Sequence, residues 1–179
     1  DFTYPDYLDK DQQYIFLPNH ASSLDGTLIY MMSPHNAVTV VKNSLFYIPF
    51  IGPCFYLLDF IFIKRNKGSN LTQDISDKLL KEKKMSLSLF PEGTRNYNSN
   101  ELGKLKSGAF VIASKTGIPI LPIHYDMIDK INDNKMRIKF GKKVTITCGS
   151  VILTEGKAPE EIMEEYRQLY RNLNVKINA

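Results

Sequence analysis

Cysteine is scarce in this chain of 179 residues, which contains only Cys54 and Cys148. Neither lies in a CxxC pair or next to a histidine, and the chain has only three histidines. This pattern argues against a disulfide framework and against a cysteine-based metal site. We therefore expect no metal and a reducing compartment.

We expect no secretory signal peptide, and the sequence shows no internal repeat and no linker that would divide it. Its formal charge of +4 is a modest basic excess, and no DNA- or RNA-binding signature accompanies it, so we expect no nucleic-acid partner. The length and the 43% hydrophobic content suit a single domain over residues 1–179. Because the chain begins with Asp1 rather than Met, a membrane anchor upstream of it is left open.

No uninterrupted apolar stretch is long enough to span a bilayer. Residues 45–63 come nearest, but Pro49, Gly52, Pro53 and Asp59 interrupt them. We interpret this segment as a broken helix that leads into a buried strand, and we expect residues 45–58 to belong mainly to the core. Any remaining apolar surface would be available to a lipid chain or a membrane interface.

Short apolar segments alternate with amphipathic ones along the chain, which predicts an α/β fold. The alternation implies a mostly parallel central sheet flanked by helices, with an antiparallel strand pair near the C-terminus formed by residues 136–140 and 144–148. Pro119 and Pro122 predict an edge or a bulge in their strand. Strands are expected at residues 14–17, 37–41, 60–63, 85–90, 118–125, 136–140 and 144–148. Helices are expected at residues 26–32, 44–58, 70–84 and 106–115, and from Pro159 onward.

His20 follows the first expected strand and precedes the first expected helix. Open α/β sheets bind ligands at the carboxyl ends of their strands. An imidazole has an ordinary pKa of about 6.5 and can accept a proton near neutral pH. His20 is therefore a candidate general base.

Asp25 lies at an offset that would separate it from His20 by about 140° on a continuous helix. Across a turn, however, its carboxylate can fold back onto the imidazole, fix the tautomer and stabilise the protonated ring. An aspartate at a helix start can equally serve as the N-cap. No Gly-x-Ser-x-Gly elbow, the signature of a nucleophilic serine, surrounds Ser22 or Ser23. We therefore interpret both mainly as residues of the turn and the helix start.

A second polar turn, Phe90-Pro-Glu-Gly-Thr-Arg95, follows the strand at residues 85–90. A parallel sheet would bring this turn to the same rim as His20. Gly93 allows close approach of a ligand to the backbone, and the guanidinium of Arg95 suits phosphate. Glu92 can accept a hydrogen bond from a substrate hydroxyl or hold an arginine. The alternative is a polar surface turn with a local Glu92–Arg95 pair.

Two further features have lower specificity. Lys64 and Arg65 follow the third expected strand, where cations are common at surfaces. At that rim, however, Arg65 would supply a second phosphate-binding guanidinium. His124 lies in the proline-containing strand, where we expect a hydrogen-bonded imidazole in the core or at the rim.

Residues 19–25 fit the pattern NHxxxxD, and residues 90–95 read FPEGTR. With these motifs in this order, the sequence resembles the glycerolipid acyltransferase family, which includes lysophosphatidic acid acyltransferases. Weaker similarities at residues 62–65, 106–110 and 118–123 extend the resemblance over residues 14–123.

The resemblance implies transfer of a fatty acyl group from acyl-coenzyme A or acyl carrier protein to the free hydroxyl of a lysophospholipid. The first expectation is conversion of 1-acylglycerol 3-phosphate to phosphatidic acid. His20 would be the general base and Asp25 its partner, with no bound cofactor. Backbone amides of the His20 turn are the candidates for stabilising the oxyanion. The implied substrate-binding residues are Arg65, Glu92, Gly93, Thr94 and Arg95.

Other functions remain as alternatives. Glycerol 3-phosphate or another lysophospholipid would change only the acceptor. A serine hydrolase using Ser22 or Ser23, or a non-catalytic lipid-binding module, would change the class of function. The resemblance further implies a membrane-associated protein, with the membrane surface as a partner and an active site that faces the cytoplasm.

Overall fold

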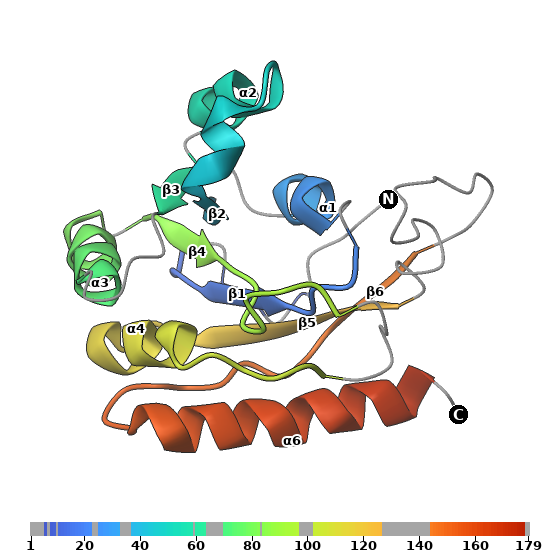
Figure 1. The fold of residues 1–179 in the computed structure, drawn as a ribbon. Coiled ribbons are helices and arrows are strands. Elements are labelled where there is room, and N and C mark those ends of the chain that lie inside the picture. Colours follow the sequence, from blue (N-terminus) through green and yellow to red (C-terminus); the bar gives the residue numbers. More distant parts are fainter. Residues whose placement is uncertain are drawn as a thin grey trace.

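A six-stranded sheet forms the centre of the computed structural model (Figure 1). The residues that the structure describes are 6, 8–9, 11–22, 25–32, 37–58, 60–63, 70–82, 84–96, 102–126 and 144–177. The strands are β1 (Ile15–Pro18), β2 (Ala37–Lys42), β3 (Ile61–Ile63), β4 (Ser86–Ser88), β5 (Ile120–Asp126) and β6 (Thr145–Cys148). The helices are α1 (Asp25–Met32), the 3-10 helix η1 (Asn43–Tyr47), α2 (Ile51–Leu57), α3 (Leu71–Lys81), α4 (Gly108–Thr116) and α6 (Pro159–Ile177).

The strand order is β3-β2-β4-β1-β5-β6, and every pairing is parallel except that of β5 with β6. In the centre, Phe16 lies opposite Ser88 on one side and Leu121 on the other. The predicted fold class is confirmed: a mostly parallel sheet flanked by helices, with an antiparallel pair near the C-terminus. The partner of β6 in that pair is β5, whereas the predicted strand at residues 136–140 lies outside the described residues.

The sheet is covered on both faces because its central strand is apolar on both sides. All four residues of β1 are buried. Ile15 and Leu17 pack in a core cluster with residues of α3, α4 and α6, while Phe16 packs in a second cluster with Leu121 and Ala21. Figure 1 shows α1 on one side of the sheet, and α4 and α6 on the other. This double coverage is typical of parallel sheets.

Pro122 does not mark a sheet edge, because β5 lies between β1 and β6. Ile123 pairs with Cys148 and Ile120 with Ile152, so the segment facing β5 holds one residue more than β5 over this interval. The extra residue forms a bulge opposite Pro122, whose carbonyl accepts a 2.8 Å hydrogen bond from the Gly149 N–H. Of the two expectations for this strand, the edge is wrong, and the bulge is present but lies in the segment facing β5 and not in β5 itself.

The expectation that residues 45–58 belong mainly to the core is wrong. No residue of η1 is buried, and Phe50 and Leu57 are 86% and 79% exposed. Pro49 interrupts the segment, and α2 packs mainly against η1 instead of lying flat on the sheet (Figure 1). None of the helices in the described ranges is both long and apolar enough to cross a membrane.

The C-terminal helix α6 is tied to the sheet by two buried tyrosines. The Tyr166 hydroxyl donates to the carbonyl oxygen of Leu17 over 3.1 Å, and the Tyr170 hydroxyl lies 2.6 Å from Nδ1 of His124. Burial raises the pKa of both tyrosines, so each keeps its hydroxyl proton. The tautomer of His124 sets which partner donates in its bond with Tyr170. His124 is 1% exposed, which confirms the expected hydrogen-bonded, buried imidazole.

Burial of His124 predicts a loss of stability at mildly acidic pH. Desolvation lowers the pKa of His124 below its ordinary value of 6.5, and the charge of Asp126 opposes this only in part. As the pH falls, His124 therefore binds a proton more readily in the unfolded chain than in the folded one. Its contribution to the free energy of unfolding is full above about pH 6.5 and decreases below it. We expect the wild-type Tm to drop between about pH 7.5 and 5.5 more steeply than the Tm of His124→Gln, which does not titrate. Equal slopes for the two proteins would contradict this assignment.

Candidate active site

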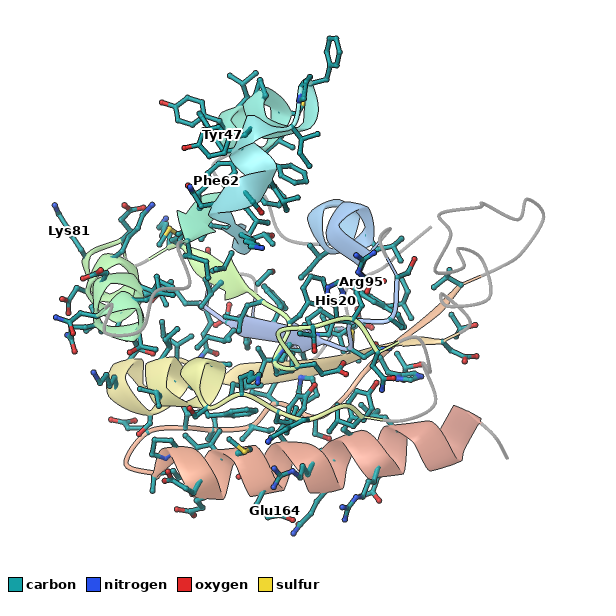
Figure 2. All side chains as sticks on the ribbon, in the orientation of Figure 1. His20, Tyr47, Phe62, Lys81, Arg95 and Glu164 are labelled. Atoms are coloured by element: carbon teal, nitrogen blue, oxygen red, sulfur yellow. The ribbon has the colours of Figure 1, made fainter. Side chains whose placement is uncertain are left out.

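The carboxyl ends of the parallel strands form one rim of the sheet, and both sequence motifs lie on it. The order of the strands reverses beside β1, which has β4 on one side and β5 on the other. His20 follows the end of β1, and the turn at residues 90–93 follows the end of the neighbouring β4. Figure 2 shows His20 and Arg95 in this region. Ligand sites of open α/β sheets occur at such a reversal.

The carboxylate of Asp25 contacts the imidazole of His20, as expected if the chain turns between them. Its Oδ2 lies 2.7 Å from Nδ1 of His20 and accepts hydrogen bonds from the amides of Ala21 and Ser22, over 2.7 and 2.9 Å. Asp25 is the first residue of α1 and is fully buried. Its side chain thus points back to the turn before the helix and not, as an N-cap would, to the amides of the first helical turn.

This contact sets the protonation pattern of the ring. An ionised carboxylate only accepts hydrogen bonds, so Nδ1 of His20 carries the hydrogen and Nε2 keeps its lone pair. The His20 side chain is 22% exposed, whereas the Asp25 side chain has no exposure. The arrangement is chemically suited to accept a proton from a group on the rim and to stabilise the resulting imidazolium.

Three further contacts hold His20 in place. Its N–H donates to Oε1 of Glu92 over 2.8 Å, and its carbonyl oxygen accepts from the Asn96 N–H over 2.6 Å. The Phe90 ring stacks on the imidazole with 4.2 Å between ring centroids and 19° between planes. The FPEGTR turn and the residue after it therefore contact both the backbone and the ring of His20.

Asn19 fixes the same turn from the other side, a role that the sequence analysis missed. Its Oδ1 accepts from the N–H of Tyr125 over 2.7 Å, and its Nδ2 donates to the carbonyl oxygen of Tyr125 over 3.2 Å. The side-chain amide thus acts like one more peptide group pairing with β5 beyond the end of β1. The signal in the sequence was an asparagine between the first expected strand and His20, and its burial is visible only in the structure.

Glu92 is 2% exposed, and backbone amides use both of its carboxylate oxygens. Oε1 binds the His20 amide, and Oε2 accepts from the Gly103 N–H over 3.0 Å. Burial raises the pKa of Glu92, and these two amide hydrogen bonds oppose the rise. Because both oxygens hold backbone amides of the site, the geometry favours a positioning role for Glu92. Contact with an arginine or with substrate stays a prediction.

A tight turn aims the Glu92 side chain inward. The Gly93 N–H donates to the Phe90 carbonyl oxygen over 3.1 Å, and Gly93 has a φ of 65°. A left-handed residue in this place is easily accommodated only as glycine. Pro91, second in the turn, suits its fixed φ.

The other predicted site residues fall into two groups. Thr94 and Arg95 are exposed on the loop after the turn, next to Asn96, which binds His20. Arg65 and Ser23 lie outside the described residues, so their substrate-binding and nucleophile roles stay predictions. Ser22 is fully buried, which disfavours it as a nucleophile.

The amides expected to stabilise an oxyanion are already engaged at the start of the His20 turn. Glu92 binds the His20 N–H, and Asp25 binds those of Ala21 and Ser22. These three donors serve the internal geometry of the site, which disfavours them as oxyanion donors. In the described ranges of the chain, no group of three or more His, Cys, Asp or Glu side chains is placed to hold a metal ion.

An apolar cleft of about 390 Å³ opens beside this site. Phe90, which stacks on His20, contributes to its wall together with Gly93 and Lys106. Away from the turn, the lining is aliphatic. It consists mainly of Val40, Ile63, Leu71, Ile75, Leu89, Ala109 and Ile112. The cleft is therefore an apolar cavity lined by the sheet and by the helices α3 and α4, and Phe90 is the lining residue that also contacts His20.

Comparisons with known proteins agree with this arrangement. Residues 1–126 match the model of the Acyltransferase family. The chain is 32% identical over 168 residues to 1-acyl-sn-glycerol-3-phosphate acyltransferase of Salmonella typhimurium, and 38% identical over 114 residues to the enzyme of that name from Saccharomyces cerevisiae. These alignments cover 92% and 62% of this chain, and 64% and 37% of those proteins. The chain spans about half the length of the curated relatives it matches.

A solved structure shares the fold. The crystal structure of the 1-acyl-sn-glycerophosphate acyltransferase PlsC from Thermotoga maritima matches with a TM-score of 0.76 at 23% identity, over 96% of this chain and 68% of that one. The family match covers both the His20 turn and the FPEGTR turn. This chain belongs to the Acyltransferase family.

Proposed function

We propose that this chain transfers a fatty acyl group from a thioester to the free hydroxyl of 1-acylglycerol 3-phosphate, which yields phosphatidic acid. The observation that carries the proposal is the 2.7 Å contact between His20 and the buried Asp25, on the same rim as the FPEGTR turn. The relatives named for 1-acyl-sn-glycerol-3-phosphate acyltransferase support the choice of acceptor.

In the proposed reaction, Nε2 of His20 removes the proton of the acceptor hydroxyl as its oxygen attacks the thioester carbonyl. The C–O bond forms, the tetrahedral intermediate collapses, and the C–S bond breaks. The leaving thiolate takes the proton from the imidazolium, which restores the free enzyme. Asp25 stabilises the transient positive charge on the ring, and general-base assistance of this kind contributes roughly 10²–10⁴-fold to the rate.

The apolar cleft is the proposed place for the acyl chain. Its aliphatic lining can exclude water from a hydrocarbon tail. Phe90 lies in its wall and stacks on His20, so we place the carbonyl end of the tail at this ring. Because the lipid acceptor and product belong to membranes, we propose that the protein works on a membrane surface, with its active site toward the cytoplasm.

The proposal is tested by measuring free thiol released from acyl-coenzyme A and from acyl carrier protein in the presence of detergent-dispersed acceptors. The acceptors to compare are 1-acylglycerol 3-phosphate, glycerol 3-phosphate and a lysophosphatidylcholine. We expect the highest kcat/KM for the first. Preference for another acceptor would change the substrate, and acceptor-independent thiol release would indicate a hydrolase.

Arg95→Ala is expected to raise the KM for 1-acylglycerol 3-phosphate about tenfold with little change in kcat. The side chain is exposed on the rim, where a guanidinium can bind the phosphate in the ground state and the transition state alike. The matched control is Arg171→Ala, which removes an exposed arginine from α6. The same KM for both variants and the wild type would contradict the phosphate role. With a monoacylglycerol acceptor, which has no phosphate, Arg95→Ala should leave the acceptor KM unchanged.

A further inference from the structure

Six exposed apolar side chains are concentrated in η1, α2 and the turn between them. We call this set the aromatic patch. It consists of Phe46, Tyr47, Ile48, Phe50, Tyr56 and Leu57. Elsewhere in the described ranges, the large apolar side chains with comparable exposure are the isolated Leu80 and Leu153. Such a concentration marks an interaction surface more often than single exposed residues do.

The aromatic patch has a fixed structure. Gly52 is buried against η1: its N–H donates to the Ile48 carbonyl over 2.9 Å, and a Cβ in its place would overlap the Phe46 carbonyl. The Phe46 ring makes edge contacts with Tyr56 and with Phe62 of β3, at centroid distances of 6.4 and 5.3 Å. The patch is therefore anchored to the sheet, and Figure 2 shows Tyr47 and Phe62 on this same projecting unit.

Phe50 is the clearest sign that the exposure has a function. It has a φ of 65°, and it is the one residue other than glycine in the described ranges with a positive φ. A bulky side chain in this region costs free energy, and strained residues of this kind cluster at functional sites. Here the strain holds an aromatic ring in solvent at 86% exposure.

The aromatic patch lies at the rim that carries His20. η1 begins directly after the carboxyl end of β2, and β2 runs parallel to β4 and, through it, to β1. Figure 1 shows α2 projecting from the sheet on the side of α1, away from α4 and α6. A flat surface that touches the patch can therefore lie next to the entrance of the active site.

The chemistry of the segment favours a lipid surface over a protein. The sequence contains no acidic residue between Asp25 and Asp59, and Lys42 is exposed at the base of η1. The positive charge of Lys42 complements anionic headgroups, and no acidic side chain of this segment repels them. Tyr47 and Tyr56 each combine an apolar ring with a polar hydroxyl, the type of side chain that is enriched at membrane interfaces.

We propose that the aromatic patch inserts into the interfacial region of an anionic bilayer and thereby places the His20 rim against the lipid headgroups. The docking itself depends only on the patch, whereas its use in delivering a lipid acceptor rests on the proposed function. Phe50 and Leu57 are the most exposed members and make the deepest contacts with the lipid.

Vesicle sedimentation tests the docking. The chain is mixed with vesicles of phosphatidylcholine containing phosphatidylglycerol, and the wild type is compared with Phe50→Asn/Leu57→Ser. Asparagine tolerates a positive φ, so the fold should persist, and Tm verifies this. We expect the double variant to bind at least about tenfold more weakly, because two apolar side chains no longer enter the interface.

The matched control is Leu80→Ser/Leu153→Ser, which removes two exposed leucines outside the aromatic patch and should bind like the wild type. Equal binding by all three proteins would overturn the proposal. So would a wild type that ignores vesicles but forms a dimer, detected by sedimentation velocity, that the patch variant loses, because the patch would then be a contact between copies. Patch-dependent vesicle binding by a chain without acyl transfer would support the docking and contradict only the proposed function.

Discussion

Replacement of His20 by alanine is expected to lower kcat for acyl transfer about 10²–10⁴-fold. The imidazole is the group on the rim whose free ring nitrogen can accept a proton, since the other nitrogen is held 2.7 Å from Asp25. The acceptor KM should change little, because the substitution removes an interaction that is made only in the transition state. Release of coenzyme A thiol from a labelled acyl donor measures this loss.

The fold should survive this substitution. Oδ2 of Asp25 would still accept from the amides of Ala21 and Ser22, and the backbone of residue 20 would still bind Glu92 and Asn96. Circular dichroism and Tm should therefore remain close to those of the wild type. A correctly folded His20→Ala protein with full activity would remove the base assignment.

Glu92→Gln is expected to reduce kcat about 10–100-fold and to leave the KM of the acceptor within about twofold. The carboxylate accepts from two backbone amides, whereas a glutamine side chain can accept from only one and turns an N–H toward the other. One buried donor then loses its partner, at a cost of about 1–3 kcal/mol in stability. The His20 turn shifts as a result, and small displacements of a catalytic group are costly to the rate.

The division between kcat and KM separates two roles of Glu92. A positioning residue affects kcat, whereas a residue that binds the acceptor hydroxyl or supports its phosphate site raises KM. Glu161→Gln, at an exposed position in the first turn of α6, is the matched control and should behave like the wild type. A tenfold rise in acceptor KM at unchanged kcat and Tm would show that Glu92 meets the substrate directly.

Local sequence patterns were sufficient for the elements and their order. The apolar run before His20 and the alternation of strands with helices predicted β1 and its neighbours, because a parallel sheet needs buried strands and helical crossovers. The helix expected from Pro159 onward is present as α6, and its Tyr166 and Tyr170 are fully buried. Residues 45–58 misled the prediction, because apolar composition shows what a segment can bury but not whether this chain supplies a surface to cover it.

The roles within the site depended on contacts that no local pattern reveals. The contact between His20 and Asp25 was predictable from their five-residue offset, because both residues belong to the same local turn. Glu92 reaches a backbone amide 72 residues away, and Asn19 reaches Tyr125 across 106 residues. Those pairings follow from the neighbours of β1 in the sheet, β4 and β5, and strand order is a property of the whole fold.

The central claim, that His20 and Asp25 remove the proton as one unit, is tested most directly by a double-mutant cycle on kcat/KM for acyl transfer. Asp25→Asn keeps an oxygen for the amides of Ala21 and Ser22, and in the described ranges Oδ1 of Asp25 has no hydrogen-bond partner to lose. With Asp25→Asn alone, we expect a large loss; added to His20→Ala, it should change kcat/KM by no more than about twofold, because the ring it serves is gone. Losses that multiply in the double variant would show that the two side chains act independently and would contradict the account.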